Sequence, residues 1–164
     1  MDRTTFETSV RGFWKHLGLG APDLDRDTDV VLSVDDLEVI LRHGEDGQVL
    51  VIEAEAGGLT GNAAAQRGEL EKLLKTSFAL SAVRDTIAVL EGEGTPQGPR
   101  ILVRGFYRYQ QGDFEKLSDL VADVISSAET LRQTLTGNRG LWRPMDMGAA
   151  TSAPQEDALV ILKP

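Results

Sequence analysis

The chain has 164 residues, no cysteine and a formal net charge of −9 at pH 7. This length suits one domain with its own core, and the lack of cysteine excludes disulfides, thiolate metal sites and a cysteine nucleophile. The acidic balance disfavours nucleic acid as a partner, and no apolar run approaches the roughly 20 residues of a membrane-spanning helix, so we expect a soluble cytoplasmic protein without membrane insertion.

The first predicted element is an amphipathic helix over residues 5–17. Apolar side chains recur there at the spacing of one helical face: Phe6, Val10, Phe13, Trp14 and Leu17. Gly18 and Gly20 end this helix, and Pro22 confirms the stop. An acidic loop over residues 23–29 comes next.

Three strand-like segments follow the acidic loop. Residues 30–34 form a short apolar run, and residues 37–43 alternate apolar and polar side chains. A turn over residues 44–47, with Gly at both ends, leads into a further strand over residues 48–54. The pattern predicts an antiparallel hairpin preceded by a short strand.

The second half of the chain contains two helices and two strands. Asn62 is a favourable N-cap for a helix that runs to about Ser77. Residues 83–91 and 100–107 are predicted strands, joined by a loop rich in Gly and Pro. The longest helix opens at Gly112 or Asp113 and stops at Gly137. Its apolar residues have three- and four-residue spacing: Phe114, Leu117, Val121, Val124, Ala128, Leu131 and Leu135.

This order, α-β-β-β-α-β-β-α, predicts an α+β fold in which an antiparallel, twisted sheet packs against helices. We divide the chain into a domain over residues 1–137 and a C-terminal tail over residues 138–164. The tail ends in a short β-prone segment, Ala158–Leu162. One hypothesis is that this segment pairs with an exposed sheet edge. It would then occupy the groove in which a partner binds until that partner displaces it.

Residues for metal or phosphate chemistry are few. His16 and His43 have no second histidine three or four residues away, which excludes a zinc signature. The alternating acids of the 23–29 loop lack the Gly and Glu of a calcium loop, so a solvated acidic loop is the preferred interpretation. Gly61 is followed by Asn62 instead of the Lys of a phosphate-binding loop. We therefore predict no metal and no cofactor.

Catalytic groups are equally scarce. No serine lies on a Gly-x-Ser-x-Gly elbow, and Glu53 and Glu55 lie two apart on one strand face, where solvated carboxylates are expected unless a polar pocket surrounds them. We predict no catalytic residue and no enzymatic activity, which leaves protein binding as the function. Phe13 and Trp14 are candidates for it, because the apolar stripe is wide enough to exceed what one sheet covers; the alternative is that both lie in the core. Phe106, Tyr107 and Tyr109 add amphipathic area of the kind found in interfaces.

Several local patterns are those of one known protein family. They are a first helix that ends in Leu17-Gly18-Leu19, an acidic Gly turn between the strands over 37–43 and 48–54, a Leu-rich segment over residues 70–78, Gly112-Asp113-Phe114 before the last helix, and the segment over residues 128–132. In these features and in its element order, the chain resembles the class I, Tir-chaperone-like chaperones of bacterial type III secretion. The resemblance spans about residues 5–135.

The resemblance implies a homodimer and a secreted effector as partner, whose N-terminal segment wraps around the chaperone in a non-globular form and stays soluble and export-competent. The residues that match the family's dimer interface are Leu70, Leu73, Leu74, Phe78, Ile87 and Val89. The residues that match its effector-binding patches are Phe13, Trp14, Val30, Leu32, Ile101 and Val103. Hydrophobic anchors and strand addition at a sheet edge would supply the binding energy.

Two alternatives stay open from the sequence. One is another protein-binding module on a similar fold, such as a regulatory protein that sequesters a secretion regulator. The other is a small-molecule-binding or enzymatic α+β domain, which a deep polar pocket around Glu53 and Glu55 would support.

Overall fold

The computed structural model describes residues 3–22, 24, 29–45, 47–59, 62–92, 98–109 and 112–139. Its elements are α1 (Arg3–His16), β1 (Val30–Val34), β2 (Leu37–His43), β3 (Val49–Gly58), α2 (Ala63–Ser81), β4 (Thr86–Glu91), β5 (Arg100–Arg108) and α3 (Phe114–Arg139). The predicted order of helices and strands is therefore confirmed. The tail and its Ala158–Leu162 segment lie outside the described residues.

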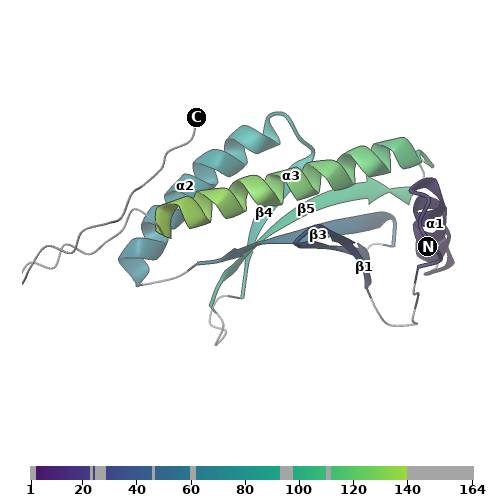
Figure 1. Cartoon of the computed structure of the whole chain (residues 1–164), viewed down its shortest axis with the longest axis horizontal. Helices are drawn as coiled ribbons and strands as arrows, with labels where there is room; N and C mark the ends of the chain where they lie inside the picture. Colours follow the sequence, from purple (N-terminus) through teal and green to yellow (C-terminus); the bar gives the residue numbers. More distant parts are fainter. Residues whose placement is uncertain are drawn as a thin grey trace, which may run out of the picture.

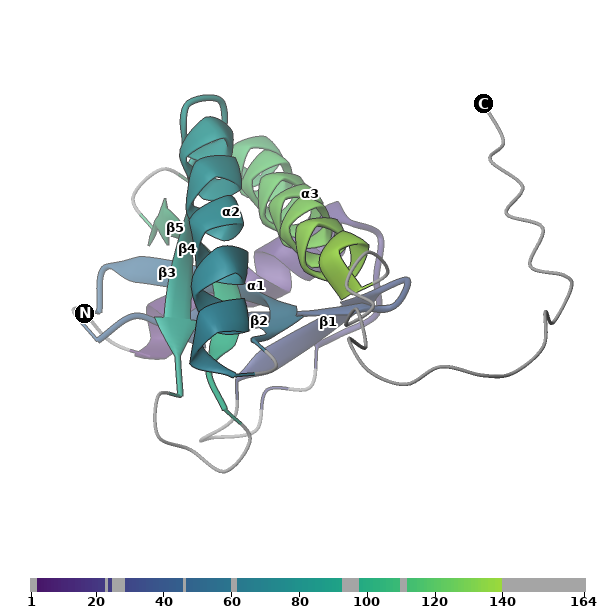
Figure 2. The same ribbon diagram turned by 90° about the vertical axis from the view of Figure 1, so that its left-hand side faces the viewer.

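The five strands form one antiparallel sheet in the order β1-β2-β3-β5-β4. The β1, β2 and β3 strands are a meander, whereas β5 pairs with β3 and places β4 at the far edge. The long helix α3 runs along one face of the sheet, α2 lies beside α3 and β4, and α1 lies at the opposite end of the molecule (Figures 1 and 2). Among the described residues, no helix covers the other face of the sheet (Figure 1).

The core lies between α3 and the covered face of the sheet. The alternation predicted for β2 holds, since Leu37, Val39 and Leu41 are all buried. The helix lies close to β5: a methyl group added at Gly105 would come within 2.9 Å of a Leu120 methyl carbon. Glycine at this position therefore permits the close approach of α3.

Local signals fixed several element ends. The Asn62 side chain accepts a hydrogen bond from the Ala65 N–H at 3.1 Å, which confirms the predicted N-cap of α2. The Asp113 carboxylate caps α3 in the same way, with the Lys116 N–H at 3.3 Å.

Four predicted boundaries were wrong. The strand β3 continues to Gly58, beyond the expected end at residue 54, and α2 continues to Ser81, beyond the expected end near Ser77. Gly137 does not stop α3, which continues to Arg139, because one helical glycine costs only about 1 kcal/mol relative to alanine. The strand β4 begins at Thr86, because the helix α2 extends to Ser81 and residues 82–85 form the connecting turn.

Candidate protein-binding surfaces

Helix α2 leaves most of its apolar surface uncovered. Leu73 is its only buried residue, although the helix is 19 residues long. Leu74 is 68% exposed and Phe78 is 81% exposed. An amphipathic helix normally turns its large apolar side chains to the core, so this helix presents a surface that calls for a partner.

The adjoining turn and strand continue this exposure. Val83, in the turn after α2, is 77% exposed, and Ile87 of β4 is 48% exposed. We call Leu74, Phe78 and Val83 together the α2–β4 surface; Ile87 pairs with Arg104 and therefore lies on the uncovered face of the sheet. Contiguous exposed apolar area on a small protein usually marks an interaction site.

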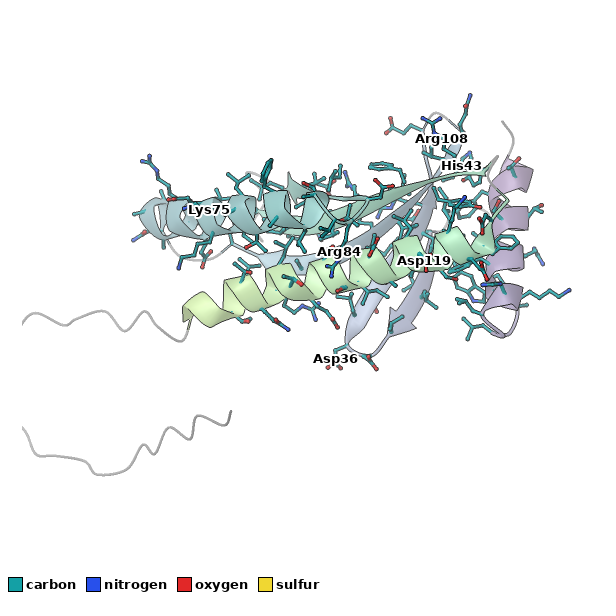
Figure 3. All side chains as sticks on the ribbon, turned by 90° about the horizontal axis from the view of Figure 1, so that it is seen from above. Asp36, His43, Lys75, Arg84, Arg108 and Asp119 are labelled. Atoms are coloured by element: carbon teal, nitrogen blue, oxygen red, sulfur yellow. The ribbon has the colours of Figure 1, made fainter. Side chains whose placement is uncertain are left out.

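Polar contacts hold the α2–β4 turn against α3. The Arg84 guanidinium lies 3.3 Å from the Ser127 hydroxyl and 3.7 Å from an Asp123 carboxylate oxygen. The hydroxyls of Thr86 and Ser127, both buried, are 3.1 Å apart. These contacts fix the turn and thereby hold Val83 and Ile87 in place; Arg84 points toward α3 in Figure 3.

The six residues matched to a dimer interface divide into three groups by exposure. Leu73 is buried inside the single chain, so its surface is already used. Leu70 and Val89 are half-buried, and Leu74, Phe78 and Ile87 are exposed. Val83 belongs with the exposed group but was missed, because a lone valine in a short turn gives no periodic signal. That two copies meet on this surface stays a prediction.

The residues matched to effector-binding patches lie mostly in the core. Phe13, Trp14, Val30, Ile101 and Val103 are all less than a tenth exposed, and Leu32 is half-buried. Both aromatic residues of α1 therefore pack inside, with their rings in edge contact at 5.9 Å.

The register explains why the strand residues are buried. Val30 and Leu32 stand opposite Leu41 and Val39 on the face that α3 covers, and Ile101 and Val103 share that face with Gly105. These side chains contact the core instead of solvent. The same parts of the chain expose other large apolar side chains to solvent: Leu17 and Leu19 after α1, Val31 on β1 and Phe106 on β5.

The uncovered face of the sheet carries an ion-pair network centred on Glu53. This residue is only 3% exposed, although its side chain lies on the face that no described helix covers. The Nε atom of Arg104 lies 2.5 Å from one carboxylate oxygen of Glu53. A guanidinium nitrogen of Arg42 lies 3.2 Å from the other. Arg104 also pairs with Glu91, and Arg42 with Asp29 at 3.3 Å. The expectation that Glu53 is solvated was wrong, because the two arginine side chains cover it.

The network also stabilises the charge of Arg104. Burial pulls the pKa of this guanidinium down, but its hydrogen bonds to Glu53 and Glu91 outweigh burial and hold the pKa above its ordinary value.

Glu55 has different contacts from Glu53, although both lie on β3. It pairs with Arg100 at 3.4 Å and lines an open hollow of about 430 Å³ together with Asp36, Glu38 and Arg132. Glu53 does not line this hollow, so the structure does not bring the two carboxylates into one pocket.

Each histidine has a packing role. The Nδ1 atom of His43 lies 2.7 Å from the Tyr109 hydroxyl, and the Phe6 ring meets the imidazole edge-on at 5.8 Å. The His16 ring lies against Phe114 at 6.2 Å. Within the described ranges, no three His, Asp or Glu side chains are grouped so as to hold a metal ion.

Solved structures share this fold at low sequence identity. The Yersinia pestis type III secretion chaperone SycH, in complex with a fragment of YscM2, superposes with a TM-score of 0.57 and 18% identity over 77% of this chain and 98% of that one. The ExoU–SpcU complex from the type III secretion system of Pseudomonas aeruginosa superposes with a TM-score of 0.59 and 16% identity, over 78% of this chain and 98% of that one. YbjN of E. coli superposes with a TM-score of 0.56 and 14% identity, over 81% of this chain and 91% of that one. The fold is therefore not confined to structures described as type III secretion chaperones.

The fold is therefore one that type III secretion chaperones adopt. The sequence itself is matched over residues 8–132 by the model of the Tir chaperone protein (CesT) family, and the chain belongs to that family. No curated protein sequence matches the chain. In the part of the chain that the structure describes, every helix is too short or too polar to cross a bilayer.

Proposed function

We propose that this chain is a cytoplasmic, homodimeric chaperone that binds the N-terminal segment of a type III secreted effector and keeps it soluble and export-competent, without catalysing a reaction. Its membership of a chaperone family supports this proposal. So do its structural neighbours, among which SycH and SchA are chaperones solved in complex with a protein partner.

The observation that carries the proposal is the α2–β4 surface. Leu74 and Phe78 lie one helical turn apart on α2 and are both mostly exposed, so together they form an apolar patch on the helix. A second copy would cover the same surface by two-fold symmetry, since identical patches meet in such an interface. Covering these side chains stabilises the assembly by about 25 cal/mol for each Å² of apolar area removed from water.

Binding of an effector segment would use the surfaces that remain free in the dimer. The strand β1 has one unpaired edge in the described sheet and no charged residue or proline in its sequence, VVLSV. Such an edge accepts an extended segment through main-chain hydrogen bonds. Val31 and Phe106 on the uncovered face, and Leu17 and Leu19 beside α1, are the exposed apolar anchors.

The first test is the solution mass of the purified protein by light scattering at micromolar concentration. The proposal expects a mass near twice 17.8 kDa. Co-expression with proteins encoded beside its gene should then yield a stable complex with one that carries an N-terminal secretion segment. A monomer that retains no such protein would contradict the proposal.

A further inference from the structure

The end of helix α1 forms one side of a hollow. Among the residues predicted to bind an effector, only Trp14 lines it. The hollow has a volume of about 420 Å³ and lies at the opposite end of the molecule from α2. Its lining residues are Arg11, Trp14, Lys15, Gly18, Leu19, Gly20, Ala21 and Pro22. The apolar part of this lining, Trp14, Leu19, Ala21 and Pro22, surrounds a space that suits one large apolar side chain.

Backbone hydrogen bonds hold the walls of this hollow in place. The N–H of Leu19 donates to the Trp14 carbonyl at 3.0 Å, which fixes one wall against the other. The N–H groups of Leu17 and Gly18 donate to the carbonyls of Phe13 and Lys15. Gly18 adopts a positive φ of 70°, the usual conformation at the end of a helix. The walls are thus set without a bound partner.

Two cations flank this hollow. Arg11 and Lys15 are exposed and lie one helical turn apart, and within the described part of the chain neither side chain forms an ion pair or hydrogen bond. Helix α1 carries Arg3, Arg11 and Lys15 against a single acid, Glu7, whereas the whole chain has a net charge of −9. Helix α1 therefore carries a net positive charge in a chain that is negative overall.

The helix dipole accounts for only one of the two cations. Lys15 and His16 lie in the last turn, where a positive charge suits the helix dipole. Arg11 precedes that turn, and the carbonyls of Phe13, Trp14 and Lys15 already accept backbone hydrogen bonds. Arg11 stands four residues after Glu7, a spacing that favours a helix. It also lines the hollow together with Lys15, so a negative group bound there would meet two cations.

We propose that this hollow binds a segment of the partner in which a large apolar residue is flanked by Asp or Glu. The apolar side chain occupies the space beside Trp14 and Leu19, and the carboxylate pairs with Arg11 and Lys15. This inference rests on the proposed function, because the partner is taken to be the extended effector segment, and it adds the charge preference of one binding position.

The chain's own acids are the competing occupant. Asp23 follows Pro22 directly in the sequence, and Asp25 and Asp27 come soon after; they lie outside the described residues. If they neutralised Arg11 and Lys15, a partner carboxylate would gain nothing there. A variant with all three changed to asparagine (D23N, D25N, D27N) separates the two cases.

The test is a selection of short random peptides on the full-length protein, in parallel with two charge-reversed variants. One variant carries Arg11→Glu and Lys15→Glu. The control carries Arg67→Glu and Lys75→Glu, two exposed positions on α2 that give the same change in net charge at the other end of the molecule. Circular dichroism verifies that all variants are folded.

The expected result is that peptides selected on the wild type and on the control place Asp or Glu beside a large apolar residue, and that those selected on the α1 variant lose this acid. An acidic peptide selected on the wild type should bind the α1 variant about tenfold or more weakly, and the loss should shrink at high ionic strength.

Three results would overturn the inference: no acidic preference on the wild type, the same preference on the α1 variant, or an acidic preference that appears only in the triple asparagine variant. Peptides that bind without acidic preference leave the chaperone proposal intact, because that proposal is tested separately by solution mass and by co-purification of an effector.

Discussion

Glu53 is the residue whose environment departs most from its chemical type. Carboxylates are almost never fully buried unless they are paired, and this one is paired on both sides, by Arg42 and Arg104. The desolvation of its charge is offset only while both arginines remain in place. The network therefore stabilises the uncovered face of β2, β3 and β5 as one unit.

Replacement of Glu53 by glutamine should lower the free energy of unfolding by about 3 kcal/mol, because it leaves two cations without their shared carboxylate. Urea unfolding measures this difference. Glu55→Gln is the matched control, since Glu55 lies two residues along the same strand and its pair with Arg100 is about half exposed. We expect the control to cost less than about 1 kcal/mol. Equal losses in the two variants would show that the network adds no stability of its own.

At the scale of elements, the contact between α3 and β5 sets the thickness of the domain. Gly105 lies opposite Leu120 and Val124, and an added methyl group would come within 2.9 Å of one and 3.0 Å of the other. Gly105→Ala should therefore destabilise the fold by about 1–3 kcal/mol through overpacking.

Gly68→Ala provides the opposite case. Gly68 lies within α2 with no atom within 4 Å of the added methyl group, so this change should stabilise the protein by about 0.5–1 kcal/mol. Thermal unfolding should show a lower unfolding temperature for Gly105→Ala and a higher one for Gly68→Ala than for the wild type. A Gly105→Ala variant as stable as the wild type would mean that α3 is free to move away from the sheet.

The start of α3 gives a pH dependence. The backbone N–H of Lys116, with some help from its ammonium group, holds the pKa of Asp113 below its usual value. A depressed pKa in the folded state means that the stabilisation is present above the unfolded pKa of about 3.9 and is lost as pH falls through the folded value. The advantage of wild type over Asp113→Ala in unfolding temperature should thus shrink below about pH 4. An advantage that stays constant down to strongly acidic pH would contradict this assignment.

Element types were predictable from the sequence because they depend on local periodicity. The seven-residue apolar series of α3 and the alternation in β2 both require only that one face meets a core. The end of α3 was not predictable in this way, since Gly137 costs too little to stop a helix that other contacts favour.

The candidate site was harder to predict, because periodicity shows which residues share a face and not what covers that face. Phe78 and Phe13 both lie in apolar helical patterns, but the first is exposed and the second fully buried. Only the tertiary packing of α1 and α2 against the rest of the domain decides between them. Likewise, the burial of Glu53 depends on Arg42 and Arg104 from two neighbouring strands, which no local pattern reveals.

At the scale of the whole molecule, the two ends of the domain differ in chemistry. One end, at α2 and β4, exposes large apolar side chains; the other, at α1, combines a small apolar hollow with cations. This division allows self-association at one end to leave the other free for a different partner.

A single charge placed on the α2–β4 surface should separate these two roles. Phe78→Glu puts a carboxylate where the proposed dimer needs an apolar contact, and burial of an unpaired charge costs several kcal/mol. Phe78 is 81% exposed in the single chain, so the fold should be retained while the solution mass falls from twice 17.8 kDa to 17.8 kDa.

Leu17→Glu is the matched control for that experiment. Leu17 is also an exposed apolar residue, 39% accessible, but it lies at the α1 end. The Leu17→Glu protein should remain dimeric in sedimentation velocity. If both variants are monomeric, or if both remain dimeric, the α2–β4 surface is not the interface, and the exposed face of α2 must be covered by a different partner.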